Sequence, residues 1–305
     1  MIATRAHRPI AALALSTVLL IASCGPPSST PPAETASPAT SATGPAAIGA
    51  PSASPAAPSP GPATPRHVFV VVMENRTLAQ ALNGGYLADL ADRSVLATNY
   101  HSVATPSLPN YLALTSGETF GIRDDRYHAL PAVGIGQQLT SAGVPWRAYI
   151  EGLTEGCLDS PYPYAVQHNP FAYYGGECPK NVVSLDQLAA DLRGTTPRFV
   201  WITPDLCHDG HDCATADADA WLAATVPMIL ASQAWRDDGV LFIVWDEGSG
   251  GDDRIPLVVI APKVAARRVT DPLDHYSLLA TVEDVLGVPR LGGAVGARSL
   301  DDLLR

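Results

Sequence analysis

Residues 67–77 read HVFVVVMENRT, an unbroken run of β-branched and apolar residues that stops at Glu74 and Asn75. A continuous apolar run of this length is typical of a strand that is buried on both faces of a parallel sheet. In such sheets, ligands collect beyond the carboxyl ends of the strands. We therefore expect Glu74 and Asn75 to lie at a binding edge.

A second run repeats this arrangement, because VLFIVWDEG places Asp246 and Glu247 directly after apolar residues 240–245. If the two strands are neighbours, the acidic side chains converge, and like charges 4 Å apart repel by roughly 4 kcal/mol per pair at an effective dielectric near 20. A cation between them would relieve this repulsion. The alternative is that each pair is a solvated turn, but the recurrence favours a cation site.

Apolar runs and helical spacings alternate over residues 66–305. Strands are predicted at 68–73, 95–99, 145–150, 198–202, 240–245 and 256–260, and helices at 108–115, 135–142, 184–193, 217–234 and 276–286. This alternation predicts one α/β domain, a three-layer α/β/α structure with a mainly parallel central sheet. Residues 152–181 are rich in Tyr, Pro and Gly and predict an active-site loop.

The N-terminal segment predicts export. Arg5 and Arg8 precede an apolar stretch at 10–22 that has the length of a signal-peptide core, so residues 1–23 should be removed. The sequence Ile-Ala-Ser-Cys ending at Cys24 is similar to a bacterial lipobox, which predicts that Cys24 carries a lipid. An ordinary secretory signal is the alternative.

Residues 24–65 consist almost wholly of Pro, Ala, Ser, Thr and Gly. Such a composition cannot build a core, so this segment is predicted to be a disordered tether. The net charge of −11 argues against nucleic acid as a bulk partner. A phosphate ligand would therefore have to be held locally, by a metal ion and by directed hydrogen bonds.

Four cysteines lie in the predicted domain, and an even number in an exported chain indicates disulfides. Sequence order favours the pairs Cys157–Cys178 and Cys207–Cys213, although three pairings are possible. A zinc site is the alternative, but the chain contains no Cys-x-x-Cys pair. The pairing Cys157–Cys178 would staple the predicted active-site loop.

Ser107 lies at the predicted start of a helix in the segment YHSVATPSLPNYLALTSG, with Pro109 suited to the first turn. The positive end of a helix favours both an attacking alkoxide and a bound phosphate. The alternative is a plain helix cap.

Five ordered segments, MENRT, ATPSLPNYLALTSG, HDGHD, WDEG and HYSLLATVEDVLGVP, carry a family resemblance. Together they resemble the phosphoesterase family of bacterial acid phosphatases and phospholipases C, within the alkaline-phosphatase superfamily. The resemblance is closest to the short actinobacterial secreted acid phosphatases of phosphatidylinositol 3-phosphatase type. It implies an alkaline-phosphatase-like fold.

The resemblance also implies roles for individual residues. The metal ligands would be Glu74, Asn75, Asp246 and Glu247; the nucleophile Ser107; the leaving-group histidines His211 and His275; and the substrate-binding residues Asn110, Asp209 and His168. Two departures stand out. Many relatives carry a histidine where this chain has Thr105, and the segment after Glu247 lacks the pattern of the phospholipase branch.

Oxygen ligands of this kind suit Mg²⁺, Ca²⁺ or Mn²⁺, and the nearby histidines also admit Zn²⁺. We therefore expect one divalent metal ion and a phosphorylated small molecule or phospholipid as substrate. The hypothesis is a lipid-anchored extracytoplasmic acid phosphatase that hydrolyses monoesters, phosphoinositides among them, through a phosphoserine. A phospholipase C-type phosphodiesterase and a catalytically weak phosphate-binding lipoprotein are the alternatives. The sequence does not indicate an oligomeric state.

Overall fold

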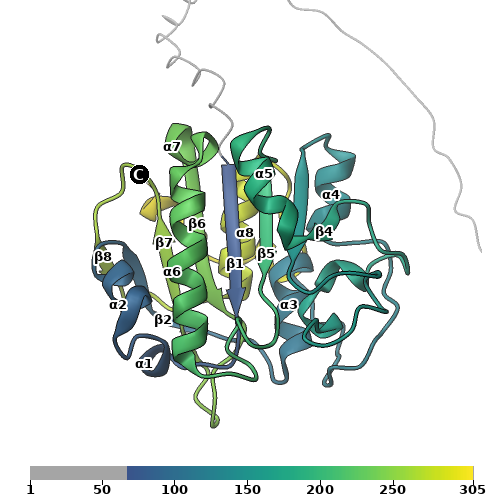
Figure 1. Ribbon diagram of the computed structural model, residues 1–305, viewed down its shortest axis with the longest axis horizontal. Coiled ribbons are helices and arrows are strands. Elements are labelled where there is room, and N and C mark those ends of the chain that lie inside the picture. Colours follow the sequence, from purple (N-terminus) through teal and green to yellow (C-terminus); the bar gives the residue numbers. More distant parts are fainter. Residues whose placement is uncertain (1–66, 305) are drawn as a thin grey trace, which may run out of the picture. The chain divides into compact units, whose positions relative to one another are not determined.

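A nine-stranded sheet forms the centre of the computed structural model, which describes residues 67–304 (Figure 1). Its strand order is β4-β3-β5-β1-β6-β7-β2-β8, and β9 also pairs with β2. The strands are β1 (His67–Met73), β2 (Val95–His101), β3 (Trp146–Ile150), β4 (Val182–Ser184), β5 (Phe199–Thr203), β6 (Gly239–Trp245), β7 (Arg254–Ile260), β8 (Arg267–Val269) and β9 (Leu273–Asp274).

The sheet is mainly parallel, as predicted. β1 runs parallel to both β5 and β6, whereas β7 is antiparallel to its neighbours β6 and β2. The short connection from Trp245 to Arg254 explains this exception, because a parallel return would need a crossover of a dozen or more residues. The carboxyl ends of β1, β5, β6 and β2 therefore share one edge with the turn that leads into β7.

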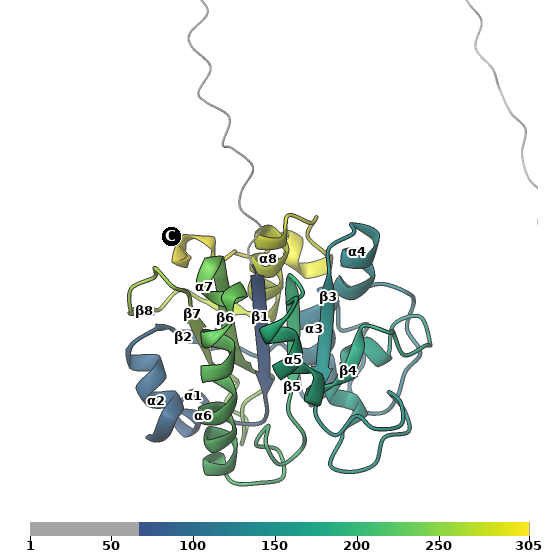
Figure 2. The ribbon, with the colours of Figure 1, turned by 45° about the horizontal axis from the view of Figure 1, so that its top comes forward.

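Helices cover both faces of the sheet and complete the predicted three layers (Figures 1 and 2). One face carries α2, α5, α6 and α7, and the other carries α3, α4 and α8. The helices are α1 (Leu78–Ala81), α2 (Gly85–Asp92), α3 (Ser107–Ser116), α4 (Ile135–Ser141), α5 (Leu188–Arg193), α6 (Thr215–Ala231), α7 (Gln233–Asp238) and α8 (His275–Leu286). Short 3₁₀ helices are η1 (Val166–His168), η2 (Pro170–Ala172), η3 (Leu185–Gln187), η4 (Gly292–Val295) and η5 (Asp301–Leu303).

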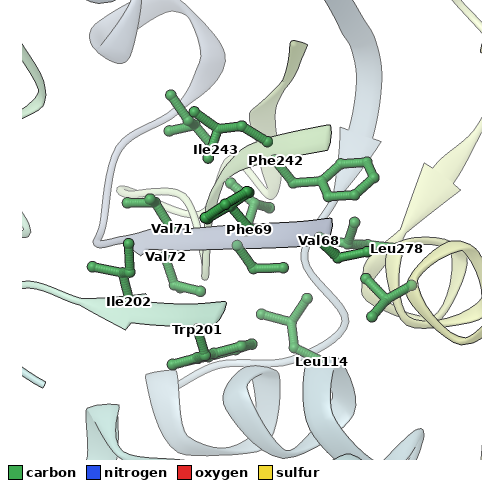
Figure 3. Packing of buried hydrophobic residues seen from close by; sticks show 14 of the residues in the cluster. Val68, Phe69, Val71, Val72, Leu114, Trp201, Ile202, Phe242, Ile243 and Leu278 are labelled. Atoms are coloured by element: carbon green, nitrogen blue, oxygen red, sulfur yellow. The ribbon is translucent and has the colours of Figure 1, made fainter. Parts of the chain in front are cut away.

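β1 lies in the middle of the core. Figure 3 shows Val68 and Phe69 of this strand among apolar side chains from β5, β6, α3 and α8. Burial of such side chains stabilises the fold by about 1.5–3 kcal/mol each. The register pairs Met73 with Trp245, so the polar residues that follow these two strands emerge side by side.

Several element boundaries differ from the predictions. The helix predicted at 217–234 is broken at Ser232, whose extended backbone ends α6 and whose side chain caps α7 by accepting a hydrogen bond from Trp235 N. The helix predicted at 184–193 is instead the end of β4, a 3₁₀ turn and the short α5. The predictions also missed α1, β4, β8 and β9, which have only two to four residues and give no clear periodicity. They missed α2 as well, although its buried Leu87, Leu90 and Ala91 follow helical spacing.

The predicted signal peptide (1–23), the lipidated Cys24 and the tether (24–65) lie outside the described residues, so they stay predictions. Within residues 67–304, every helix is too short or too polar to cross a membrane.

Candidate active site

The ends of β1 and β6 bring the two predicted polar pairs, Glu74-Asn75 and Asp246-Glu247, together. Asp246 N donates to Met73 O (2.9 Å), and Asn75 N donates to Asp246 Oδ1 (3.1 Å). Asn75 has a φ of +55°, a left-handed conformation that costs energy for residues other than glycine. Glu74 and Asp246 are fully buried, and the predicted neighbourhood of the two strands is confirmed.

Ser107 is the first residue of α3, and its side chain is directed at Glu74. Its Oγ donates to Glu74 Oε2 (3.0 Å), and only 4% of the residue is exposed. The next backbone N–H, of Leu108, donates to Asp125 Oδ1 (2.9 Å). The predicted nucleophile therefore stands at a helix N-terminus, where one carboxylate accepts from its hydroxyl and another accepts from the backbone N–H that follows.

Asn110, for which the resemblance implied a substrate-binding role, forms hydrogen bonds with the loop that precedes Ser107. Its Oδ1 accepts from Val103 N and Ala104 N (both 3.0 Å), and its Nδ2 donates to Ala104 O (2.9 Å) and to Pro106 O (3.3 Å). The carboxamide is thus occupied by the loop that precedes Ser107. This geometry favours a positioning role over a direct contact with phosphate.

His168 and Asp209 join Glu74 from two further loops. His168 Nδ1 lies 3.0 Å from Asp209 Oδ2, and His168 Nε2 lies 3.3 Å from Glu74 Oε1. All three residues are buried. The resemblance implied substrate-binding roles for His168 and Asp209, but their ligand atoms lie within 4.8 Å of one another and of those of Glu74, a spacing that suits a shared metal ion.

Both predicted disulfides are present, and each closes a loop that carries site residues. Cys157–Cys178 encloses His168, and Cys207–Cys213 encloses Asp209 and His211. The predicted loop at 152–181 therefore does reach the site. A zinc site at these cysteines is excluded because the sulfur atoms are bonded to each other.

His211 lies at the exposed side of the site. Its ring centre is 5.6 Å from that of His168, and its Nδ1 lies 2.7 Å from Asp212 Oδ1. Among the described residues, none forms a hydrogen bond with His211 Nε2. This nitrogen therefore keeps its hydrogen-bonding capacity for a partner outside the described residues.

His275, predicted as a second leaving-group histidine, is fully buried. Its Nε2 lies 2.6 Å from the Asp246 carbonyl oxygen and its Nδ1 lies 3.0 Å from Tyr100 Oη. Burial lowers the pKa of His275 to about 4. Because the ring is neutral and both of its nitrogens have partners, the geometry favours a role for His275 in positioning the Asp246 backbone over a role as a proton donor to the substrate.

Burial dominates the electrostatics of the site. It raises the pKa of Glu74 well above its ordinary value, with Asp246 and Asp209 adding repulsion. Burial likewise raises the pKa of Asp246 and of Asp209 to about 8, and it lowers the pKa of His168 to about 3. Without a cation, the negative charge of these carboxylates is disfavoured and the imidazole is held neutral.

A divalent cation fits this donor set. Glu74 Oε1, Asp246 Oδ2 and His168 Nε2 are buried atoms without a hydrogen-bond partner in the described residues. Such orphaned groups are costly unless something binds them. Carboxylate oxygens with one neutral imidazole are suitable ligands for Mg²⁺, Mn²⁺ or Zn²⁺.

Besides Asp125, which accepts from Leu108 N, the predictions missed Arg76 and Tyr111. Arg76 donates to Asn75 O (2.9 Å), Cys213 O (2.9 Å) and Thr215 Oγ1 (2.8 Å), tying the end of β1 to the second disulfide loop. Tyr111 stacks on His168 with 5.3 Å between ring centres. Tyr111 follows Ser107 by four residues, so both lie on the same face of the helix. This spacing could have indicated that Tyr111 also faces the site.

Two of the cavities lined by described residues have volumes typical of small-molecule sites. One, of about 410 Å³, lies between α5 and the junction of α6 and α7, and includes no predicted site residue in its lining. The other, of about 380 Å³, borders Asn75, Thr105 and Glu247 at the catalytic edge. The second cavity is therefore the one connected to the site.

The Phosphoesterase family's sequence model matches residues 83–289, more than half of the chain. The chain belongs to the phosphoesterase family. As a member, it is a hydrolase that acts on phosphoric ester bonds. The match contains Ser107, Asp209 and Asp246, whereas Glu74 and Asn75 precede its first residue.

Curated relatives of this phosphoesterase are named phosphatases. The phosphatidylinositol-3-phosphatase of Mycobacterium tuberculosis is 29% identical over 252 residues, covering 78% of this chain and 82% of that protein. A probable acid phosphatase of Kluyveromyces lactis is 27% identical over 262 residues, covering 74% of this chain and 59% of that protein. An acid phosphatase of Aspergillus fumigatus is 26% identical over 256 residues, with 73% and 55% covered. The chain thus spans little more than half the length of these fungal relatives.

Solved structures show the same fold. A protein in the alkaline phosphatase superfamily from Vibrio parahaemolyticus has a TM-score of 0.57 at 14% identity, covering 78% of this phosphoesterase and 70% of that chain. The phosphonate monoester hydrolase from Silicibacter pomeroyi has a TM-score of 0.54 at 13% identity, with 79% and 76% covered. The predicted family and the alkaline-phosphatase-like fold are both confirmed.

Proposed function

We propose that this phosphoesterase is an extracytoplasmic, metal-dependent phosphomonoesterase that works through a phosphoserine at Ser107. The observation that carries the proposal is the hydrogen bond from Ser107 Oγ to Glu74 Oε2, among buried ligand atoms that lack partners. The phosphatase names of the relatives support a monoester substrate.

The metal ligands would come from two parts of the site. The ends of β1 and β6 would supply Glu74, Asn75, Asp246 and Glu247, and the two disulfide-closed loops would supply His168 and Asp209. A divalent cation held there would offset the carboxylate charge and stabilise negative charge on the phosphoryl oxygens. Of the predicted metal ligands, Glu247 lies at the rim of this group, where burial raises its pKa and the Thr105 hydroxyl opposes that rise.

In the first step, Ser107 Oγ attacks phosphorus and its proton passes toward Glu74 Oε2. The new Oγ–P bond forms as the bond from phosphorus to the leaving oxygen breaks, and that oxygen takes a proton from His211 Nε2 or from water. Water then attacks the phosphoserine and its proton passes to His211 Nε2 or to solvent, which restores the donor of the first step. As the Oγ–P bond breaks and phosphate is released, Ser107 Oγ regains its proton from Glu74 Oε2. The helix N-terminus favours the negative charge throughout.

Ser107→Ala tests the proposal on p-nitrophenyl phosphate. We expect kcat/KM to fall roughly a thousandfold or more, because no other hydroxyl takes the place of the nucleophile. Acid-quenched wild-type protein should carry a phosphoryl group on Ser107 by peptide mass spectrometry. Retention of more than a few percent of the activity by a folded variant would refute the nucleophile.

The two alternatives give different products. Release of a phosphorylated headgroup from an intact phospholipid, in place of inorganic phosphate from a monoester, would identify a phosphodiesterase. Ligand binding without turnover across a broad range of metals and pH would identify a binding protein. The experiment is a substrate panel on EDTA-stripped protein with metals restored one at a time.

We also propose an outward-facing location, with Cys24 as a lipid anchor and residues 24–65 as a tether. The two disulfides support an oxidising compartment. Globomycin, which blocks lipoprotein signal cleavage, should leave a larger precursor in cells that express the full chain. An unchanged size under globomycin would contradict the lipid anchor.

A further inference from the structure

Tyr111 is fully buried, and its hydroxyl has no hydrogen-bond partner among the described residues. A buried hydroxyl without a partner is costly, so its presence calls for a reason. Three atoms of the proposed cation site are in the same condition: Glu74 Oε1, Asp246 Oδ2 and His168 Nε2. Of these four residues, Tyr111 is the one that is not itself a proposed ligand.

Helix α3 places the hydroxyl of Tyr111 beside the carboxyl group of Glu74. One turn earlier on the same helix face, Ser107 Oγ donates to Glu74 Oε2 (3.0 Å). Burial raises the pKa of Glu74 most, and Asp246 and Asp209 add to the rise. The hydroxyls of Tyr111 and Ser107 oppose this rise in pKa, as donors to a carboxylate do. Two hydroxyls from one helix therefore face one carboxyl group.

The ring of Tyr111 constrains a second proposed ligand. It stacks on His168, with 5.3 Å between the ring centres and 7° between the ring planes. His168 Nδ1 is also held, because it lies 3.0 Å from Asp209 Oδ2. With one face and one edge of the imidazole constrained, its Nε2 is directed at Glu74 Oε1, 3.3 Å away.

Tyr111 is itself supported by the sheet. Its ring centre lies 6.3 Å from that of Trp201, and Trp201 Nε1 donates to Thr203 Oγ1 (2.8 Å) on the same strand, β5. The Glu74 carboxylate has no comparable constraint of its own, because the terminal torsion of a glutamate is broad. Its orientation therefore depends on the groups beside it, and a rigidly held hydroxyl can supply that orientation.

We propose that Tyr111 is a positioning residue of the cation site, whose hydroxyl orients the Glu74 carboxylate and whose ring orients the His168 imidazole. One side chain of α3 thus aligns two ligands from distant segments with the nucleophile on the same helix. Residues that orient metal ligands typically contribute about ten- to a hundredfold to metal affinity. This inference rests on the proposed function, since it requires a cation at these ligands.

Tyr111→Phe tests the hydroxyl, because this variant keeps the stacked ring. EDTA-stripped protein would be titrated with Mg²⁺, Mn²⁺ and Zn²⁺ in turn by calorimetry. For each ion that the wild-type protein binds, we expect the Kd of Tyr111→Phe to be about tenfold higher. Tyr111→Leu also removes the ring, so its Kd should rise about a hundredfold.

The unfolding midpoint separates this role from simple packing. In EDTA, Tyr111→Phe loses no hydrogen bond and removes a buried hydroxyl without a partner, so its midpoint should equal or exceed that of the wild-type protein. At the same excess of cation the order should reverse, because the tighter binder gains more stability from its ligand. A midpoint for Tyr111→Phe below that of the wild-type protein by the same amount in both conditions would overturn the inference.

Tyr173→Phe is the matched control, because Tyr173 is also fully buried and its hydroxyl likewise has no partner among the described residues. Its ring lies against Tyr127, with 5.2 Å between the ring centres. This variant should keep the wild-type Kd, and an equal rise in Kd for both tyrosine variants would overturn the assignment to Tyr111. A wild-type protein that binds none of the three ions would refute the proposed cation, and this inference with it. A wild-type Kd in Tyr111→Phe would overturn the inference alone.

Discussion

Ser107 Oγ and Glu74 Oε2 lie 3.0 Å apart, joining the first residue of α3 to the residue that follows β1. One carboxylate oxygen thus accepts from the predicted nucleophile, while the other, Oε1, has no hydrogen-bond partner among the described residues. Glu74 is therefore the residue through which the nucleophile and a cation would be coupled.

The first prediction concerns the cation. Adding Mg²⁺, Mn²⁺ or Zn²⁺ to EDTA-stripped protein should raise the unfolding midpoint, because the metal relieves repulsion among buried carboxylates. At a hundred times its Kd, a bound ligand adds about 2.7 kcal/mol to the free energy of unfolding. Glu74→Gln should lose most of this shift in differential scanning fluorimetry.

Glu151→Gln is the control for this experiment, because Glu151 belongs to a separate, partly exposed group with Asp205 and His208. That variant should keep the full cation shift. If Glu151→Gln abolished the shift and Glu74→Gln did not, the cation would bind away from Ser107.

A second prediction separates a positioning role from a substrate contact at Asn110. Asn110→Ala leaves the Val103 and Ala104 N–H groups without their acceptor, so the free energy of unfolding should fall by roughly 1–3 kcal/mol. We expect kcat to fall at least tenfold, with less than a threefold change in the inhibition constant for inorganic phosphate. A rise in the inhibition constant for phosphate with an unchanged kcat would instead support a direct contact between Asn110 and phosphate. Asn83→Ala, at an exposed site, is the control.

Removal of the Cys207–Cys213 disulfide should cost little stability but much activity. In the chain-entropy account, loops of 6 and 21 residues contribute about 2 and about 3 kcal/mol to the free energy of unfolding. Cys207→Ser/Cys213→Ser should therefore be the less destabilised pair variant in urea titration. It should nevertheless lose at least tenfold in kcat, because that loop holds Asp209 and His211. Full activity in the folded variant would contradict this role.

The fourth prediction concerns pH and lies away from the catalytic edge. Glu283 is buried, its Oε1 accepts from Leu291 N (2.9 Å), and burial raises its pKa to about 8. Because the folded state binds this proton more tightly than the unfolded state, the free energy of unfolding decreases as pH rises from about 4.5 to about 8.

Glu283→Gln keeps the acceptor oxygen and removes the titration. It should match wild-type stability near pH 4 and exceed it by roughly 1–3 kcal/mol near pH 8. Chemical denaturation at both pH values measures this difference. If the difference in the free energy of unfolding between the two proteins were the same at pH 4 and at pH 8, the raised pKa of Glu283 would be refuted.

Much of the framework could be predicted from the sequence because its signals are local. The apolar run from Val68 to Met73 gave the central strand, and the acidic residues after Trp245 marked a second strand end. Disulfide pairing by sequence order was also correct, since each pair closes a short loop. Ser232 shows the limit of such signals, because its side chain caps α7 within a stretch whose apolar spacing is continuous.

The ligand set of the site depended on contacts between distant segments. His168 and Glu74 are 94 positions apart in the sequence, yet His168 Nε2 lies 3.3 Å from Glu74 Oε1. Asn110 and His275 fell at matching positions of the family motifs, but their hydrogen bonds are with the protein's own backbone and Tyr100. Motif position gives the residue type but not the direction of the side chain.

Apolar periodicity and motif order are properties of the chain alone, so they were enough to predict the class of fold, the family and the polar stop at Glu74 and Asn75. Tertiary structure alone decided which groups share the site. Pairing of β1 with β6 and closure of two disulfide loops bring Asp246, Asp209 and His168 to Glu74. In that buried setting each unpaired charge is costly, and this cost is the physical reason to expect a cation there.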